Sequence, residues 1–342
     1  MSVPTTMKAI GFTRSLPISD EQSLFEYDTQ VPTPGDYDLQ VKVNAVSINP
    51  VDAKIRCRAA ADKVLETPRV VGYDAVGIVA AVGDKVDGFA PGDRVYYAGD
   101  VTRQGSHAEY QLVDARIASH APHSLTDPQA AVMPLTVLTA WEALFDRLRI
   151  TPSEKKSLLI IGGAGGVGSI AIQLAKQLTH LTVIATASRP ETQAWVREMG
   201  ADHVVDHRDL VHSMKAQGLE TVDYIFNVAD TKGHWDAMAE LIAPQGMIAS
   251  IVEFDGGVDL SKLQGKSAGF IWELMFTRTL FKTDDMAKQR DILFQVANLI
   301  DAGRIRSTLT DTIEGFGAEQ LRQAHELIES GRAIGKIAVN FD

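Results

Sequence analysis

The fold of this chain is decided by one glycine-rich stretch, Gly162-Gly163-Ala164-Gly165-Gly166-Val167-Gly168. It follows a short apolar run at 158–161 and precedes a helical pattern over 168–178. Gly163, Gly165 and Gly168 have the spacing G-x-G-x-x-G, in which glycine permits a tight turn, close approach to a pyrophosphate and close helix packing. The free N–H groups at the helix start favour phosphate. This pattern predicts that residues 163–168 form a dinucleotide site. These residues are Gly163, Ala164, Gly165, Gly166, Val167 and Gly168. The alternative is a glycine-rich loop without a ligand.

Strands and helices alternate after this turn. Short apolar strands are expected at 181–186, 203–205, 222–226 and 247–251. Helical patterns lie between them, at 190–199, 209–216 and 232–242. This alternation predicts an α/β domain with a parallel sheet and helices on both faces.

The chain before the turn has a β pattern. Residues 39–48 alternate, with Val41, Val43 and Ala45 on one face, as in a half-buried strand. Further short strands are expected at 76–82, 94–97 and 108–113, followed by a helix at 134–146. Helices at 285–302 and 318–330 and a strand at 337–339 form the tail. We therefore predict a β-rich domain over 1–128, completed by 276–342, and a nucleotide-binding domain over 129–275.

Composition narrows the functional classes. The 342 residues carry a formal net charge of −11, which disfavours nucleic-acid binding. The one cysteine, Cys57, cannot form an internal disulfide or a multi-thiolate zinc site. Neither a signal peptide nor a membrane-spanning run is evident in the sequence. We expect a cytoplasmic protein that acts on a small molecule.

The end of the second strand bears on cofactor choice. NAD sites usually place an acidic residue there to bind the ribose 2′-hydroxyl, but no Asp or Glu occurs between Gly168 and Pro190. Ser188 and Arg189 could instead bind a 2′-phosphate, with His207 as a weaker candidate. The prediction is NADPH. The alternative is that Arg189 is an ordinary surface charge and both cofactors are tolerated.

Several motifs together resemble the medium-chain dehydrogenase/reductase superfamily over nearly the whole chain. Residues 44–52 look like the N-P-x-D segment of its quinone oxidoreductase branch, 72–79 are similar to G-H-E-x-x-G-x-V, and 92–95 match G-D-R-V. The nearest group in appearance is the bacterial zinc-type alcohol dehydrogenase-like proteins. The resemblance implies a GroES-like β-rich domain, a Rossmann domain and a return to the first domain.

Comparison with the same family shows that this chain lacks the usual metal ligands. Zinc-dependent members have cysteine or histidine ligands where this chain has Asn49 and Tyr73, and residues 134–136 near the third position offer none. Zinc needs several N, S or carboxylate ligands around one point. We therefore predict no metal. Without zinc to acidify an alcohol, reduction of a quinone or an α,β-unsaturated carbonyl is the expected chemistry.

The candidate catalytic residues are Asn49, Tyr73, Asp52 and Thr136. Asn49 and Tyr73 could donate hydrogen bonds to a developing oxyanion. Asp52 more simply orders its loop, and Thr136 matches the family's nicotinamide contact. Lys336 falls where the family has a basic residue that reaches the cofactor's pyrophosphate.

Two other functions stay open: a zinc-type alcohol dehydrogenase with unusual ligands, and a non-catalytic NADPH-binding sensor or structural protein. The family resemblance also implies a homodimer formed through an edge strand of the Rossmann sheet. Residues 269–276 are apolar enough to form that interface, although they could equally be a buried strand or cover the substrate cleft.

Overall fold

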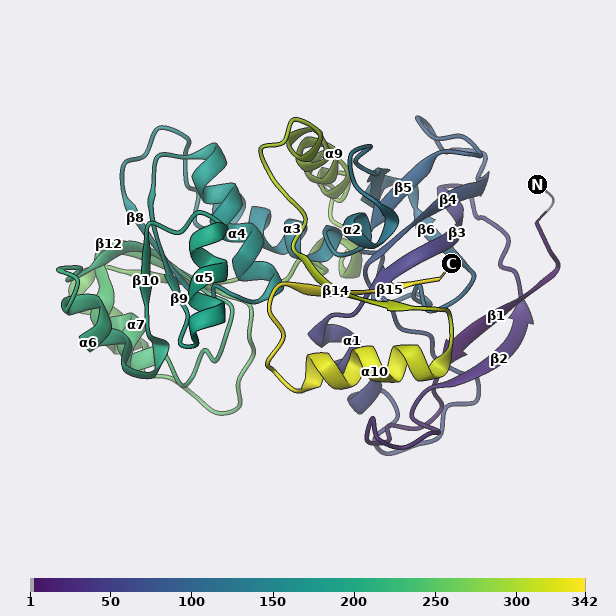
Figure 1. Cartoon of the computed structure of the whole chain (residues 1–342), viewed down its shortest axis with the longest axis horizontal. Coiled ribbons are helices and arrows are strands. Elements are labelled where there is room, and N and C mark those ends of the chain that lie inside the picture. The colour runs from purple at the N-terminus through teal and green to yellow at the C-terminus, as the bar shows by residue number, and fades with distance from the viewer. Residues whose placement is uncertain (1–2, 342) are drawn as a thin grey trace. The chain divides into compact units, whose positions relative to one another are not determined.

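The computed structural model describes residues 3–341, and these form two compact units (Figure 1). The first unit contains the residues up to Leu135 and those from Phe276 onward, and the second is Thr136–Met275. The predicted α/β class is confirmed, with a β-rich unit and a parallel-sheet unit. No helix within 3–341 is long and apolar enough to cross a membrane.

The first unit is built around a seven-stranded sheet with the order β14-β15-β3-β4-β5-β7, in which β6 also pairs with β3. Its elements are β1 (Thr6–Gly11), β2 (Phe25–Gln30), β3 (Asp38–Ser47), α1 (Pro50–Arg58), β4 (Ala75–Val82), β5 (Arg94–Tyr97), β6 (Tyr110–Asp114), β7 (Ala118–His120), α2 (Asp127–Ala131), α8 (Thr277–Leu280), α9 (Lys288–Asp301), β14 (Leu309–Glu314), α10 (Ala318–Glu329) and β15 (Lys336–Asn340).

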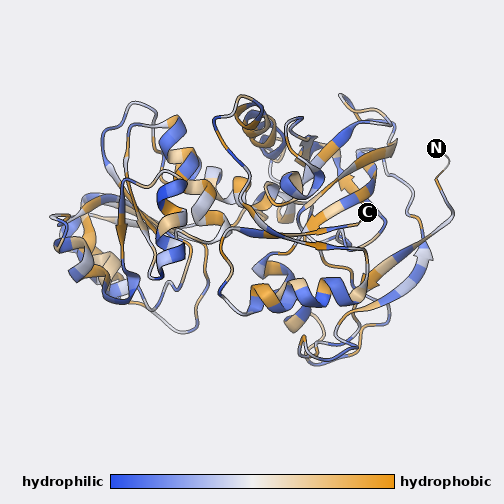
Figure 2. Cartoon of the chain, viewed as in Figure 1, coloured by the Kyte–Doolittle hydropathy of each residue, from blue (hydrophilic) through white to orange (hydrophobic). Residues whose placement is uncertain are grey.

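The C-terminal segment completes this sheet. Strand β15 pairs antiparallel with β3, so Val339 lies opposite Val46. Figure 1 shows the yellow C-terminal strands beside the purple β3, and Figure 2 shows hydrophobic stretches on β3 and β15. Valine and alanine side chains on both strands are buried, as the alternation in 39–48 predicted.

The second unit is a six-stranded parallel sheet with the order β10-β9-β8-β11-β12-β13. Its elements are α3 (Pro134–Trp141, which begins at the end of the first unit), a π-helix (Glu142–Arg147), β8 (Ser157–Ile161), α4 (Gly166–Leu178), β9 (Thr182–Thr186), α5 (Pro190–Glu198), β10 (His203–Val205), α6 (Leu210–Lys215), β11 (Val222–Asn227), α7 (Trp235–Leu241), β12 (Ile242–Ser250) and β13 (Gly269–Trp272).

Alternation along the strands divides this unit's core between two faces. Leu159 and Ile161 of β8 pack in one cluster with Met214 of α6 and Met238 of α7. Their neighbours along the strand point to the opposite face. Figure 1 shows α4 and α5 on one side of the strands and α6 and α7 on the other. The prediction of helices on both faces is confirmed.

Two details differ from the sequence expectations. The helix predicted over 134–146 is α-helical only to Trp141 and continues as a π-helix to Arg147. The predicted strand at 108–113 begins at Tyr110, because Ala108 instead makes an isolated bridge with Ala9.

Candidate functional site

The glycine-rich turn lies between β8 and α4, at the carboxyl end of the parallel strands. A Cβ atom on Gly168 would lie 2.3 Å from the carbonyl oxygen of Gly162, and one on Gly163 would lie 2.9 Å from Cβ of Ala185. Close packing therefore requires glycine at both positions. Gly165 differs, because its nearest neighbour would be 3.7 Å away, an ordinary contact. The protein's own packing does not explain Gly165, whereas a phosphate approaching the start of α4 would.

The strands beside this turn present the residues predicted to select the cofactor. Ser188 and Arg189 follow β9, and His207 follows β10, which pairs with β9. Arg189 is partly exposed, and its Nε lies 3.2 Å from a carboxylate oxygen of Glu191. Exposed pairs of this kind contribute little stability. A ligand phosphate could therefore displace Glu191 at small cost.

In the first unit, the loop before α1 brings Asn49 and Asp52 together. Asn49 is the N-cap of α1, and Pro50 occupies the first helical position. The Asp52 carboxylate accepts the backbone N–H of Asn49 at 2.7 Å and that of Gly72 at 2.8 Å. Burial raises the pKa of Asp52 to about 7, although both N–H donors oppose this shift. Asp52 thus ties α1 to the segment that carries Tyr73.

Asn49 continues this network to two charged side chains. Its Nδ2 donates to Oδ2 of Asp74 at 2.9 Å, and its Oδ1 accepts from Nζ of Lys336 at 2.6 Å. Lys336 also donates to the Ile48 carbonyl at 2.8 Å and lies 3.4 Å from Asp74. The backbone N–H of Leu135 donates to the other Asp74 oxygen at 2.8 Å. All five side-chain polar atoms of Asn49, Asp74 and Lys336 therefore have partners.

Burial dominates the electrostatics of these residues. Asn49 and Lys336 are 1% and 3% exposed, and Asp74 is fully enclosed. Burial raises the pKa of Asp74 to about 6 and lowers that of the Lys336 amine, while the opposite charge on the partner resists both shifts. Each charge offsets the desolvation cost of the other.

Tyr73 lies between these residues and a neighbouring arginine. The Asn49 amide nitrogen lies 3.5 Å from the Tyr73 carbonyl. The Tyr73 ring meets Phe276 edge-on, with centroids 5.7 Å apart, and its hydroxyl lies 3.5 Å from Nη2 of Arg69. Burial raises the pKa of the Tyr73 hydroxyl. The hydroxyl is therefore protonated at neutral pH and can donate a hydrogen bond.

Known proteins resemble the chain over almost its full length. Residues 35–123 match the alcohol dehydrogenase GroES-like domain, and residues 199–339 match the zinc-binding dehydrogenase family. A zinc-type alcohol dehydrogenase-like protein of Staphylococcus aureus (strain Mu50) is 46% identical over 341 residues, covering 98% of this chain and 100% of the relative. The chain belongs to the medium-chain dehydrogenase/reductase superfamily.

Solved structures agree with this assignment. A candidate zinc-dependent alcohol dehydrogenase of Rhizobium etli CFN 42 shares 46% identity, with a TM-score of 0.94 and 98% of each chain covered. The Escherichia coli quinone oxidoreductase complexed with NADPH shares 25% identity, with a TM-score of 0.81, covering 97% of this chain and 99% of that one. The chain is thus an oxidoreductase of this superfamily, which binds NAD(P)H.

The names of several relatives imply zinc, but the residues of this medium-chain dehydrogenase/reductase family member fit the ion poorly. The amide of Asn49 is already bonded on both ends, and the cationic Lys336 is one of its partners. A second cation beside that amine would be repelled. Among residues 3–341, no three His, Cys, Asp or Glu side chains are grouped so that they could hold a metal ion.

The structure brings some of the predicted residues together. Asn49, Asp52 and Tyr73 share one network in the first unit, and Thr136 is a buried residue of α3 in the second unit. Lys336 points into the network, which differs from the pyrophosphate contact that the resemblance implied. The sequence favoured a structural hydrogen-bonding role for Asp74 over a cation site, and the structure shows these bonds to Asn49 and Leu135. Its place after Gly72 and Tyr73, where the family motif has an acid, was the available signal.

Proposed function

We propose that the chain is a zinc-independent, NADPH-dependent reductase of quinones or α,β-unsaturated carbonyl compounds. The observation that carries this proposal is the ammonium group of Lys336, bonded to Asn49 beside Asp74 where a metal-dependent relative would need metal ligands. Without a Lewis acid, oxidation of a simple alcohol lacks the group that acidifies its hydroxyl. An electron-poor C=C or quinone needs no such group.

The hydride and the proton that this reduction requires can both be supplied without a metal. When bound, NADPH supplies a hydride to the β-carbon of the enone, and the α-carbon takes a proton from solvent; a quinone takes the hydride and a proton to become a hydroquinone. Related proteins support this direction: a 2-methylene-furan-3-one reductase of Solanum lycopersicum is 28% identical over 99% of this chain and 80% of its own length. The protein's task is to hold the acceptor and stabilise its oxygen.

We assign the roles as follows. Tyr73 donates its hydroxyl hydrogen to the acceptor's carbonyl oxygen, and Thr136 contacts the nicotinamide. Asn49, Asp52 and Lys336 act as positioning residues, because their polar atoms are already bonded to one another and to the surrounding backbone. Residues 163–168 bind the pyrophosphate, and Ser188, Arg189 and His207 surround the 2′-phosphate.

The first experiment follows NADPH oxidation with 1,4-benzoquinone and with a simple enone, each in the presence of EDTA. Turnover that survives the chelator supports the proposal. Turnover lost with EDTA and restored by zinc overturns it. The variant Tyr73→Phe keeps the ring packing against Phe276 and removes the hydroxyl, so we expect a lower kcat with little loss of stability.

Cofactor choice is tested separately. Arg189→Ala should weaken NADPH binding about tenfold to a hundredfold and leave NADH binding unchanged, because only NADPH carries the charged 2′-phosphate. Glu191→Gln is the matched control: it removes the carboxylate charge beside Arg189 and should not weaken NADPH binding. Equal losses for both cofactors in Arg189→Ala would contradict the assignment.

One observation favours a second function, that of an NADPH-binding sensor or structural protein. Tyr73 is fully enclosed, and the polar atoms of the neighbouring network are all occupied. Tight NADPH binding without turnover of any quinone or enone would support this second function.

We further propose a homodimer formed through β13. This strand is at the edge of the parallel sheet, where it pairs with β12. Trp272 and Leu274 are 46% and 51% exposed, which is unusual for large apolar side chains beside an open strand edge. Pairing with β13 of a second copy would extend the sheet and cover both side chains.

A further inference from the structure

A groove of about 480 Å³ opens on the first unit. Two loops line it. One comprises residues 63–69, which follow α1, and the other comprises residues 102–104, which follow β5. Its volume lies in the range of small-molecule sites. We call it the Arg69 groove.

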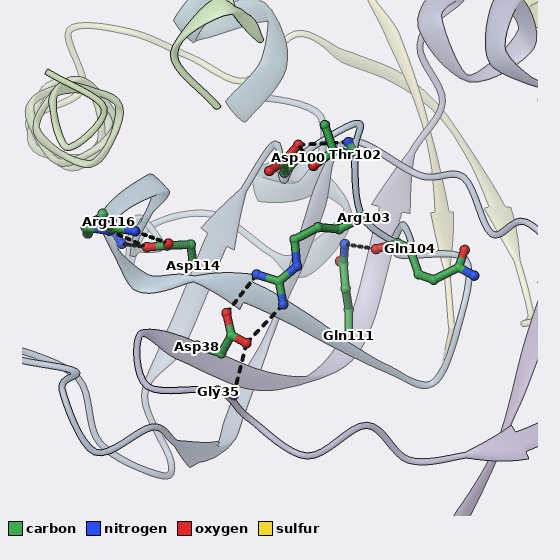
Figure 3. Close-up of polar contacts among 9 residues, drawn as sticks. All are labelled: Gly35, Asp38, Asp100, Thr102, Arg103, Gln104, Gln111, Asp114 and Arg116. Atoms are coloured by element: carbon green, nitrogen blue, oxygen red, sulfur yellow. Dashed lines mark hydrogen bonds and ion pairs between the residues drawn. The ribbon is translucent and has the colours of Figure 1, made fainter. Parts of the chain in front are cut away.

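The groove is lined by more positive than negative side chains, whereas the whole chain has a negative net charge. It is lined by Lys63, Arg69 and Arg103 and by one carboxylate, Glu66, although the chain carries a net charge of −11. Figure 3 shows that Arg103 is already committed, since its two terminal nitrogens bind Asp38 at 2.7 and 3.0 Å. Lys63 and Arg69 form no ion pair with any residue between 3 and 341, so their charges remain available.

Two acidic side chains near the groove, Asp38 and Asp100, already accept hydrogen bonds. The Asp38 carboxylate accepts the backbone N–H of Gly35 in addition to its bonds to Arg103. Oδ1 of Asp100 accepts both the backbone N–H and the hydroxyl of Thr102, at 2.8 Å each, as Figure 3 shows. Glu66 is exposed, and its single charge is outnumbered by those of Lys63 and Arg69.

Arg69 contains an unsatisfied buried donor. Its Nη2 donates to the Val101 carbonyl at 2.5 Å and lies 3.5 Å from the Tyr73 hydroxyl. Its Nε is buried, and no residue of the described chain accepts a hydrogen bond from it. A buried N–H without an acceptor is costly, so Arg69 would gain stability from one additional acceptor.

The remaining lining indicates the kind of ligand. Val64, Leu65 and Pro68 contribute apolar surface beside the two available cations. Glu66 disfavours a dianion such as a phosphate monoester, and the planar guanidinium of Arg69 suits a carboxylate. The complementary ligand therefore has an apolar body and a single carboxylate.

Resting on the function given above, we propose that the Arg69 groove binds a carboxylate of the acceptor substrate, whose reducible group is an enone or a quinone. Arg69 joins this groove to the active-site residue Tyr73, because one guanidinium nitrogen lies beside the tyrosine hydroxyl. Lys63, an exposed residue of the same lining, attracts the same carboxylate.

The test compares two acceptors that differ only in charge, 4-(3-oxobut-1-enyl)benzoate and its methyl ester. The wild-type kcat/KM should favour the acid about tenfold, since charge-assisted hydrogen bonds are strong. Lys63→Gln and Arg69→Gln should each reduce this preference through KM for the acid. Lys42→Gln removes one charge from an exposed position on β3 outside the groove and should leave the preference unchanged.

The outcomes separate the two proposals. Equal turnover of acid and ester, or an equal loss of preference in Lys42→Gln, overturns the groove assignment while the reductase function stands. If neither of these compounds nor 1,4-benzoquinone is reduced, the proposed function fails. Calorimetric binding then decides the groove: tighter binding of the acid, weakened by Lys63→Gln and not by Lys42→Gln, supports it, and equal binding of acid and ester overturns it. Because Lys63 is exposed, its variant also keeps the test valid if Arg69→Gln fails to fold.

Discussion

Nζ of Lys336 lies 2.6 Å from Oδ1 of Asn49, although 287 positions separate the two residues in the chain. This contact anchors the last strand to the start of α1. Replacing Lys336 by Met should lower the free energy of unfolding by about 3–5 kcal/mol, because Asp74 would keep a buried charge without its partner. Urea unfolding measures the effect.

A second variant identifies the cause. Lys336→Met combined with Asp74→Asn removes both charges and should recover part of the lost stability. Lys42→Met, at an exposed position on β3, is the control for the loss of a lysine. If the double variant is no more stable than Lys336→Met, an unpaired charge is not the source of the loss.

The open edge of β13 makes the oligomeric state testable. Trp272→Lys places a charge on the exposed edge strand and should convert a dimer to a monomer in light scattering, because a buried lysine opposes strand pairing. Phe294→Lys is the matched control, since Phe294 is 55% exposed on α9. A mass unchanged by Trp272→Lys would place any dimer interface elsewhere.

The sequence predicted the regular elements better than the site. The strand at 94–97 and the strand at 203–205 were predicted residue for residue, because local alternation and turn residues mark their ends. Strands β1 and β2 were missed, since several of their side chains are polar and exposed and only their mutual pairing defines them. Helix α1 was missed because its nine residues have no strong apolar face.

The site depended on contacts that no local pattern encodes. Asn49 and Tyr73 were identified from the sequence as positions that lack the family's metal ligands. The charged side chain that bonds to Asn49 in the structure, Lys336, comes from the far end of the chain. Likewise, nothing around Arg69 in the sequence indicates that its side chain reaches Val101 and Tyr73. The glycine turn was predictable because its chemistry requires neighbouring residues only.

Two buried histidines predict sensitivity to acid. The rings of His107 and His325 are 5.9 Å apart, and none of their nitrogens has a hydrogen-bond partner within residues 3–341. Burial lowers the pKa of His107 to about 3 and that of His325 well below its usual value, and the charge of Arg56 lowers the latter further. Both are therefore neutral in the folded protein and protonated in the acid-unfolded chain.

The sign of the effect follows from linkage. As the pH falls below about 6.5, the unfolded chain takes up protons that the folded protein refuses, so each histidine costs up to about 1.4 kcal/mol per pH unit. His325→Phe should flatten the dependence of unfolding free energy on pH between 6 and 4. His212→Gln, at an exposed position, should leave it unchanged. An unaltered slope in His325→Phe would exclude His325 as a source of the sensitivity.

The glycine turn offers the sharpest contrast, because two of its glycines are required for different reasons. Gly168→Ala would place a Cβ atom 2.3 Å from the Gly162 carbonyl oxygen, so overpacking should cost about 1–3 kcal/mol of stability. Gly165 has φ −75° and ψ 173°, which alanine adopts readily, and its nearest neighbour would be 3.7 Å away. Gly165→Ala should therefore fold normally and yet bind NADPH at least about tenfold more weakly, because its methyl group would occupy the space that the pyrophosphate needs. Thermal unfolding without cofactor and fluorescence titration with NADPH measure the two effects separately. Normal NADPH affinity in a well-folded Gly165→Ala would mean that the phosphates do not approach the start of α4.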